Sequence, residues 1–220
     1  MSTLKRTYSV VRNHLERWNS YHRLVESYED VVGIEALRNR YRPKRVRLLI
    51  LAESHLRSRP GSLPGFIYDA NYNGPWWHQM FRPAFAVNKP HHLNAKVRGS
   101  CLERLRESGV WVLDASIIAL SGYRKLDGKP PQRPFENERL CILETSWHGH
   151  VKALFDGAMS QRKKPVIVCF NSVRHLIPCP LQGKIYQTSF PGWGQKYNAT
   201  PLKEAAKKAG LEGCLHDIIA

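Results

Sequence analysis

Two carboxylates each follow a run of apolar residues, in a position where a buried strand would end. Glu53 comes directly after the run LLILA, and Asp114 closes the run VWVLD. A carboxylate that emerges from an apolar core into a cleft can orient a water molecule or stabilise a developing positive charge. Ser54 could hold that water, and His55 could contact a phosphate or donate to a ligand. The alternatives are structural: Glu53 as a helix cap or ion-pair partner, Ser54 as a capping hydroxyl, and Asp114 as an acceptor for backbone N–H groups.

The chain carries a large positive charge. Its 220 residues include 34 Lys and Arg but 18 Asp and Glu, so the net charge is +16 with neutral histidines. A compact protein this basic attracts polyanions; nucleic acid is the usual one, and an anionic membrane surface is the alternative. Cations gather in one predicted loop and beside a later Gly-rich segment: Arg124, Lys125, Lys129, Arg133 and Lys196. They predict phosphate contacts, against the alternative of solvated loop charge.

Cysteine and histidine spacing does not predict a metal centre. The five cysteines, at 101, 141, 169, 179 and 214, include no CxxC pair, and their number is odd. We therefore expect no disulfide framework and no zinc ribbon, and we expect a reducing compartment. Cys169 lies in an apolar run and is predicted to be core. His148 and His150 have a spacing that could suit a metal, but no Asp, Cys or further His is near them.

Apolar patterning predicts the elements that position these residues. The predicted strands are 45–52, 109–115, 165–170 and 183–188, and the first three are apolar runs typical of strands buried on both faces. Helices are predicted over 3–40, with a second short helix over 33–40, and over 78–107 (interrupted near Pro90), 135–160 and 200–209. The last would begin with Thr200 as N-cap and Pro201 as first residue. Residues 54–77 should be irregular, and 121–134 a polar basic loop.

The alternation of strand, loop and helix predicts an α/β fold: a central parallel four-stranded sheet flanked by helices, with an N-terminal helical extension. Residues 1–43 would be the extension packed on the core, and residues 44–220 the α/β domain. In such sheets ligands bind beyond the carboxyl ends of the strands. The loops that follow the four predicted strands are therefore where we expect a functional site.

Segments of the chain, in this order, resemble the motifs of the uracil-DNA glycosylase superfamily. In that family a buried strand ends in a short catalytic motif, which Ala52-Glu53-Ser54-His55 resembles in position. An aromatic residue about a dozen positions later stacks on the extruded base, and Phe66 follows Glu53 at this distance. Two motifs of the mismatch-specific and hypoxanthine-type branches resemble YDANYNGPWW (68–77) and GVWVLDASIIALSGYR (109–124). The family's later strand resembles PVIVCFNS (165–172), and its last motif resembles TSFPGWGQKYNATPLKEAAKKAG (188–210).

The resemblance implies a role for each candidate residue. The catalytic residues would be Glu53, Asp114 and Ser54, with a carboxylate positioning the water that attacks the sugar. The extruded base would be bound by His55, Phe66, Tyr68 and Asn73. The DNA would be contacted by Arg124, Lys125, Phe190, Pro191, Trp193 and Lys196, of which the apolar members would enter the base stack.

The chain departs from the family pattern in two motifs. The first usually reads Gly-Gln-Asp-Pro, Gly-x-Asn-Pro or Gly-Glu-x-Pro, and this chain has neither Gly nor Pro there. The last usually reads His-Pro-Ser or Asn-Pro-Ser, and this chain has Phe190-Pro191-Gly192. These replacements keep two alternatives open: a non-catalytic nucleic-acid-binding module of the same fold, and an enzyme acting on a free nucleotide or on RNA.

The expected function is that of a monofunctional DNA glycosylase, which extrudes a deaminated or damaged base and hydrolyses its N-glycosidic bond in base excision repair. The resemblance implies no metal and no organic cofactor. The expected partner is DNA rather than a membrane, and the expected state is a monomer. We expect no transmembrane helix and no Sec signal, and an intracellular location with access to DNA, cytoplasmic in a bacterium.

Overall fold

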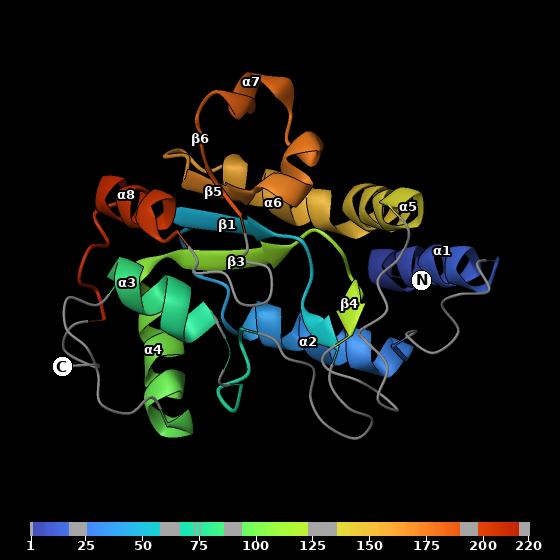
Figure 1. Ribbon diagram of the computed structural model, residues 1–220, viewed down its shortest axis with the longest axis horizontal. Helices are drawn as coiled ribbons and strands as arrows, with labels where there is room; N and C mark the ends of the chain where they lie inside the picture. Colours follow the sequence, from blue (N-terminus) through green and yellow to red (C-terminus); the bar gives the residue numbers. More distant parts are fainter. Residues whose placement is uncertain are drawn as a thin grey trace.

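The computed structural model describes residues 2–17, 26–57, 67–72, 74, 76–85, 94–122, 136–189 and 198–215. At its centre lies a four-stranded, all-parallel sheet in the order β3-β1-β5-β6 (Figure 1). Its strands are β1 (Leu48–Ala52), β3 (Val110–Asp114), β5 (Val166–Phe170) and β6 (Ile185–Thr188). Helices flank this sheet, so the predicted α/β class is confirmed. A separate parallel pair, which was not predicted, joins β2 (Leu56–Arg57) to β4 (Ser121–Gly122).

The central strands form where the sequence is continuously apolar. Every residue of β1 and β3 is buried, and the two strands pair from Leu48 opposite Val110 to Ala52 opposite Asp114. On its other edge β1 pairs with β5, with Leu48 opposite Val166. Branched apolar side chains suit a sheet covered on both faces, because each face then packs against a helix.

The helical segments follow the predictions with shifted boundaries. In chain order they are α1 (Thr3–Arg17), α2 (Tyr28–Arg40), the π-helix η1 (Trp76–Phe81), α3 (Arg82–Phe85), α4 (Ala95–Ser108), α5 (Glu136–Ser146), the π-helix η3 (Trp147–Val151), α6 (Lys152–Met159), the 3₁₀-helix η4 (Asn171–Leu176), α7 (Cys179–Gln182) and α8 (Thr200–Lys208).

Two predicted helix starts were wrong. The helix predicted over 33–40 begins earlier, at Tyr28, because Ser27 and Asp30 form a capping box in which each side chain accepts from the other's backbone N–H at 3.1 Å. The last helix begins at Thr200 itself, with Ala199 as N-cap. Thr200 is therefore not a cap; its backbone N–H donates to Asn198 Oδ1 at 3.0 Å.

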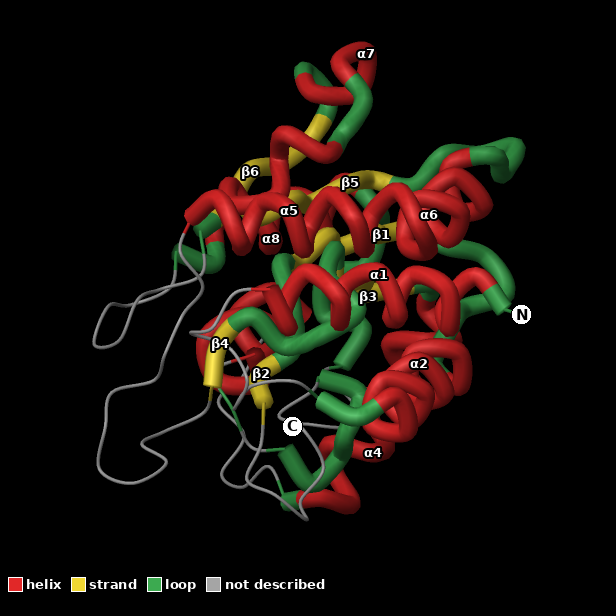
Figure 2. The backbone as a smooth tube through the Cα atoms, turned by 90° about the vertical axis from the view of Figure 1, so that its right-hand side faces the viewer, coloured by secondary structure: helices red, strands yellow, loops and turns green. Residues whose placement is uncertain are grey.

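The strand order places helices on both faces of the sheet. Since β3 and β5 lie on opposite sides of β1, right-handed crossovers put α4 and the α5–η3–α6 segment on opposite faces. Helix α8 covers β5 and β6, and α4 runs along β3. Helix α1 packs against α5 and η3, and Figure 2 shows it alongside that segment.

The N-terminal helices belong to the same hydrophobic core as the sheet. Val11 and Leu15 of α1 and Val31 and Ile34 of α2 are buried in one cluster with the residues of β1. The division into an extension, residues 1–43, and an α/β domain, residues 44–220, stays a prediction. Of the helices in the described ranges, none combines the length and the apolar character that crossing a bilayer requires.

Candidate active site at the carboxyl edge of the sheet

The strand order reverses at β1, and this reversal marks a site. The chain passes from β1 to β3 on one side and later to β5 on the other, so a crevice is expected between the carboxyl ends of β1 and β5. Glu53 directly follows β1, and Asn171 directly follows β5. Asn171 Nδ2 donates to Ser189 Oγ, just beyond β6, at 2.7 Å. Both of these residues are exposed, so this edge presents polar side chains to solvent.

Glu53 is the partly open carboxylate of this edge. Its side chain keeps 31% of its exposure, and its Oε1 accepts from Arg139 Nη1 of α5 at 2.8 Å. Arg139 also pairs with Glu136 in the first turn of α5. The hydrogen bonds that Arg139 donates to these two carboxylates, the one to Glu136 first, raise the pKa of Arg139. A guanidinium therefore holds Glu53 at a place that a ligand can reach.

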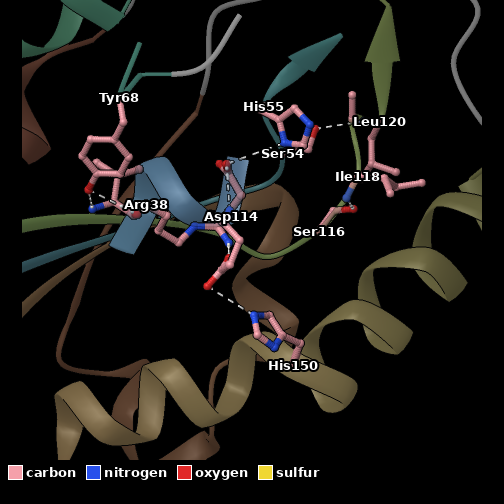
Figure 3. Close-up of polar contacts among 12 residues, drawn as sticks. Arg38, Ser54, His55, Tyr68, Asp114, Ser116, Ile118, Leu120 and His150 are labelled. Atoms are coloured by element: carbon pink, nitrogen blue, oxygen red, sulfur yellow. Dashed lines mark hydrogen bonds and ion pairs between the residues drawn. The ribbon is translucent and has the colours of Figure 1, made fainter. Parts of the chain in front are cut away.

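Ser54 joins the loop after β1 to the loop after β3. Its Oγ accepts from the backbone N–H of Leu120 at 3.1 Å (Figure 3). The same loops meet through the backbone, since Ser116 N–H donates to Glu53 O at 2.9 Å. This contact orders the loop next to Glu53, which is a structural task of the kind that the sequence left open for Ser54.

His55 points into the protein. Its side chain is fully buried, and its Nε2 donates to the carboxylate of Glu26, 2.9 Å from each oxygen. Glu26 also accepts from the backbone N–H of Ala119 at 2.9 Å. Burial lowers the pKa of His55, but the charge and hydrogen bond of Glu26 outweigh it and raise the pKa above the ordinary value. In this arrangement His55 faces a carboxylate rather than the open edge.

Asp114 is also buried, at the end of β3. Its Oδ2 lies 3.5 Å from Arg38 Nη2 and 4.0 Å from His55 Nδ1, and its side chain is 3% exposed. Burial raises the pKa of this carboxyl, and the charges of Arg38 and His55 offset only part of the effect. Arg38 reaches Asp114 from α2 (Figure 3). Asp114 and Glu53 therefore differ in access, although both close a buried strand.

Arg38 extends this network along the buried face of α2 toward η3. Its Nη1 bonds to Glu35, whose Oε1 lies 3.4 Å from His150 Nε2 of η3. His150 Nδ1 in turn lies 3.3 Å from Thr3 Oγ1 at the start of α1. We call the residues Glu26, His55, Asp114, Arg38 and Glu35 the buried ionic network. Its alternating charges link α2 to the carboxyl ends of β1 and β3.

Tyr68 supports the outer edge of β3. Its hydroxyl accepts from the backbone N–H of Val112 at 2.7 Å, and it lies 3.4 Å from the carbonyl of the same residue. Its ring stacks on Tyr41, with centroids 5.4 Å apart. The buried hydroxyl is thus engaged by the sheet, whereas the resemblance implies that Tyr68 binds a base.

The remaining predicted site residues lie outside the described residues and stay predictions. They are Phe66, Asn73, Arg124, Lys125, Lys129, Arg133, Phe190, Pro191, Trp193 and Lys196. The prediction that Cys169 is core is confirmed, since its side chain is buried.

Sequence reasoning missed the partners of the candidate residues. Asn171 had a usable signal, because it directly follows a predicted strand. Arg139 is in contact with Glu53 from 86 positions away, and Arg38 reaches Asp114 across 76. No spacing rule connects residues so far apart.

The described residues include no group of three or more His, Cys, Asp or Glu side chains placed to hold a metal ion. Comparisons with protein-family models, with curated proteins and with solved structures found no match to this chain.

Proposed function

We propose that this protein is a DNA glycosylase that excises a deaminated or damaged base, with Glu53 as its catalytic carboxylate. The observation that carries the proposal is the position of Glu53, partly exposed at the carboxyl end of β1 where the strand order reverses. The net charge of +16 supports a polyanionic substrate.

Hydrolysis of an N-glycosidic bond requires a solvent-accessible carboxylate next to the sugar. When the base leaves, the sugar develops oxocarbenium character, and a nearby negative charge lowers the energy of that state while it orients the attacking water. Glu53 meets this need. Asp114 is buried against Arg38 and His55, so in this proposal its role is to hold these two side chains in place rather than to contact the substrate.

The test is a panel of duplexes, each with one lesion, scored for abasic sites. On the active lesion we expect Glu53→Gln to slow single-turnover excision at least ~100-fold, the lower end for a positioned acid or base. DNA affinity should change only a few-fold, because the charge acts mainly in the transition state. The matched control is Glu136→Gln, which removes the other carboxylate on Arg139 and should leave the rate near that of the wild type.

Three outcomes would count against parts of the proposal. Binding without abasic sites on any lesion would favour the non-catalytic binding module. A folded Glu53→Gln that cuts at the wild-type rate would remove Glu53 from catalysis. Equal slowing by both Gln variants would mean that the ion pairs of Arg139, and not the Glu53 carboxylate, set the rate. A melting curve for each variant separates these results from unfolding.

A further inference from the structure

The amino ends of the parallel strands, opposite the candidate site, gather segments from four parts of the chain. Arg47 N–H donates to Gly109 O at 2.8 Å, and Val166 N–H donates to Arg47 O at 2.9 Å. The backbone N–H of Val46 donates to Gln161 Oε1 at 3.1 Å. Residues 44–47, 109 and 161–166 therefore lie together at this edge.

The end of α8 joins them through one side chain. Arg47 Nη2 donates to the carbonyls of Ala209 and Gly210, at 2.6 and 3.2 Å. Close approach is required at Gly109, which ends α4 with φ 92°; a Cβ there would lie 2.7 Å from the carbonyl oxygen of Arg45. The four segments thus form one continuous surface.

This surface is strongly basic. It carries eight exposed cations, which we call the basic face: Lys44, Arg45, Arg47, Arg162, Lys163, Lys164, Lys207 and Lys208. Within the described ranges none of the eight forms an ion pair with an acidic side chain. Arg47 donates to the carbonyls that end α8, and Lys208 lies 5.8 Å from the centroid of the Tyr186 ring, but neither contact neutralises a positive charge.

The helix macrodipole accounts for the positions of only some of the cations on the basic face. Cations in the last turn of a helix are favourable, and Lys207 and Lys208 end α8. Lys44 and Arg45 precede a strand, and the run from Arg162 to Lys164 follows the end of α6. Like charges gathered at one edge repel one another and oppose folding, so a polyanion that neutralises them would bind favourably.

The surroundings favour nucleic acid over an anionic membrane. Binding to a bilayer surface gains much of its strength from buried apolar side chains. The large apolar side chains that are exposed in the described residues are Val10 and Val32, which lie on α1 and α2 and not on the basic face.

We propose that the basic face binds a second stretch of duplex nucleic acid through its phosphates, independently of sequence and of base excision. Strand β1 has five residues at about 3.3 Å each, so this face lies about 16 Å from the candidate site, on the opposite edge of the sheet. The site at one edge would hold the lesion while the other edge holds the backbone of a neighbouring segment. This binding goes beyond the proposed function, because it needs no turnover.

The test compares two triple variants that lose the same charge. Arg162→Ala/Lys163→Ala/Lys164→Ala alters the basic face, and Lys5→Ala/Arg6→Ala/Arg17→Ala alters exposed cations of α1. Affinity for an undamaged duplex is measured by fluorescence anisotropy over a range of salt. We expect the first variant to bind at least ~10-fold more weakly at about 0.1 M salt and to lower the log–log salt slope by up to ~2.7, which is about 0.9 for each phosphate that the variant no longer neutralises. The control should lose much less affinity.

The result also separates this proposal from the proposed function. Single-turnover excision at saturating protein should be unchanged in the basic-face variant, and Glu53→Gln should leave the salt slope unchanged. Equal losses in the two triple variants, or none in either, would overturn the proposal. So would a basic-face variant that keeps duplex binding but loses binding to phosphatidylserine vesicles, which would assign the surface to a membrane.

Discussion

Buried His55 lies against two carboxylates, Glu26 and Asp114, so its protonation is linked to folding. Burial favours the neutral ring, but Glu26 and Asp114 favour the charged one more strongly, and Arg38 opposes them weakly, so the pKa of His55 is raised. The stabilisation from this pair is fully present below the unfolded-state pKa of about 6.5 and is lost as pH rises through the folded-state value. The raised pKa of Asp114 gives the same sign, with a loss of stability that begins at the unfolded-state pKa of an aspartate, about 3.9.

We expect Glu26→Gln to lower the pKa of His55, because burial then acts with less opposing negative charge. The ring titration is measured by NMR, and the urea midpoint is followed from pH 6 to 9. The wild type should lose stability as pH rises above about 6.5, and the variant should show a flatter profile. A wild type whose midpoint rises over this window, or a His55 pKa that does not move in the variant, would contradict the assignment.

At the scale of elements, the outer edge of β3 depends on one side chain. Val112 turns its backbone N–H and C=O away from β1, and the hydroxyl of Tyr68 contacts both. An unpaired buried backbone group costs about 1–3 kcal/mol. Tyr68 therefore supplies β3 with hydrogen-bond contacts that a neighbouring strand would otherwise make at this edge.

We expect Tyr68→Phe to lower the free energy of unfolding by about 1–3 kcal/mol, because it leaves these two backbone groups without a partner. Urea unfolding measures the change. The control is Tyr186→Phe on β6, at the opposite edge, whose hydroxyl makes no hydrogen bond within the described part of the chain. Similar small losses in both variants would mean that the Tyr68 hydroxyl contributes little.

For the whole molecule, we expect the sheet to require the N-terminal helices in order to fold. Helix α2 supplies Arg38 to the buried Asp114, and Glu26 meets His55 just before α2 begins. Removing one partner of a buried ion pair costs about 3–5 kcal/mol, against a total stability of about 5–15 kcal/mol for a typical domain. Removing α1 and α2 would also expose the part of the core that they cover.

A chain that begins at residue 44 should therefore lack a cooperative unfolding transition. Far-UV circular dichroism during urea unfolding and binding of an apolar dye would show this, with the full chain as the control. A truncated protein that unfolds cooperatively at the midpoint of the full chain would show that residues 1–43 are dispensable for the core.

The parallel strands can be predicted from the sequence, because burial on both faces requires an unbroken apolar run. The runs at β1, β3 and β5 have this character, and the ends of the first two predict that Glu53 and Asp114 lie at the edge of the sheet. Helix boundaries are harder to predict, because a cap such as Ser27 acts over a few atoms. The alternation of elements is enough for the fold class.

The different surroundings of Glu53 and Asp114 could not be read in the same way. Both carboxylates follow apolar strands, yet one is paired with Arg139 at an open edge and the other is enclosed with Arg38 and His55. Local periodicity reports which face of an element is buried, and it carries no information about partners tens of residues away. The strand order, the buried ionic network and the basic face all arise from such long-range contacts, so they appear only once the chain is packed.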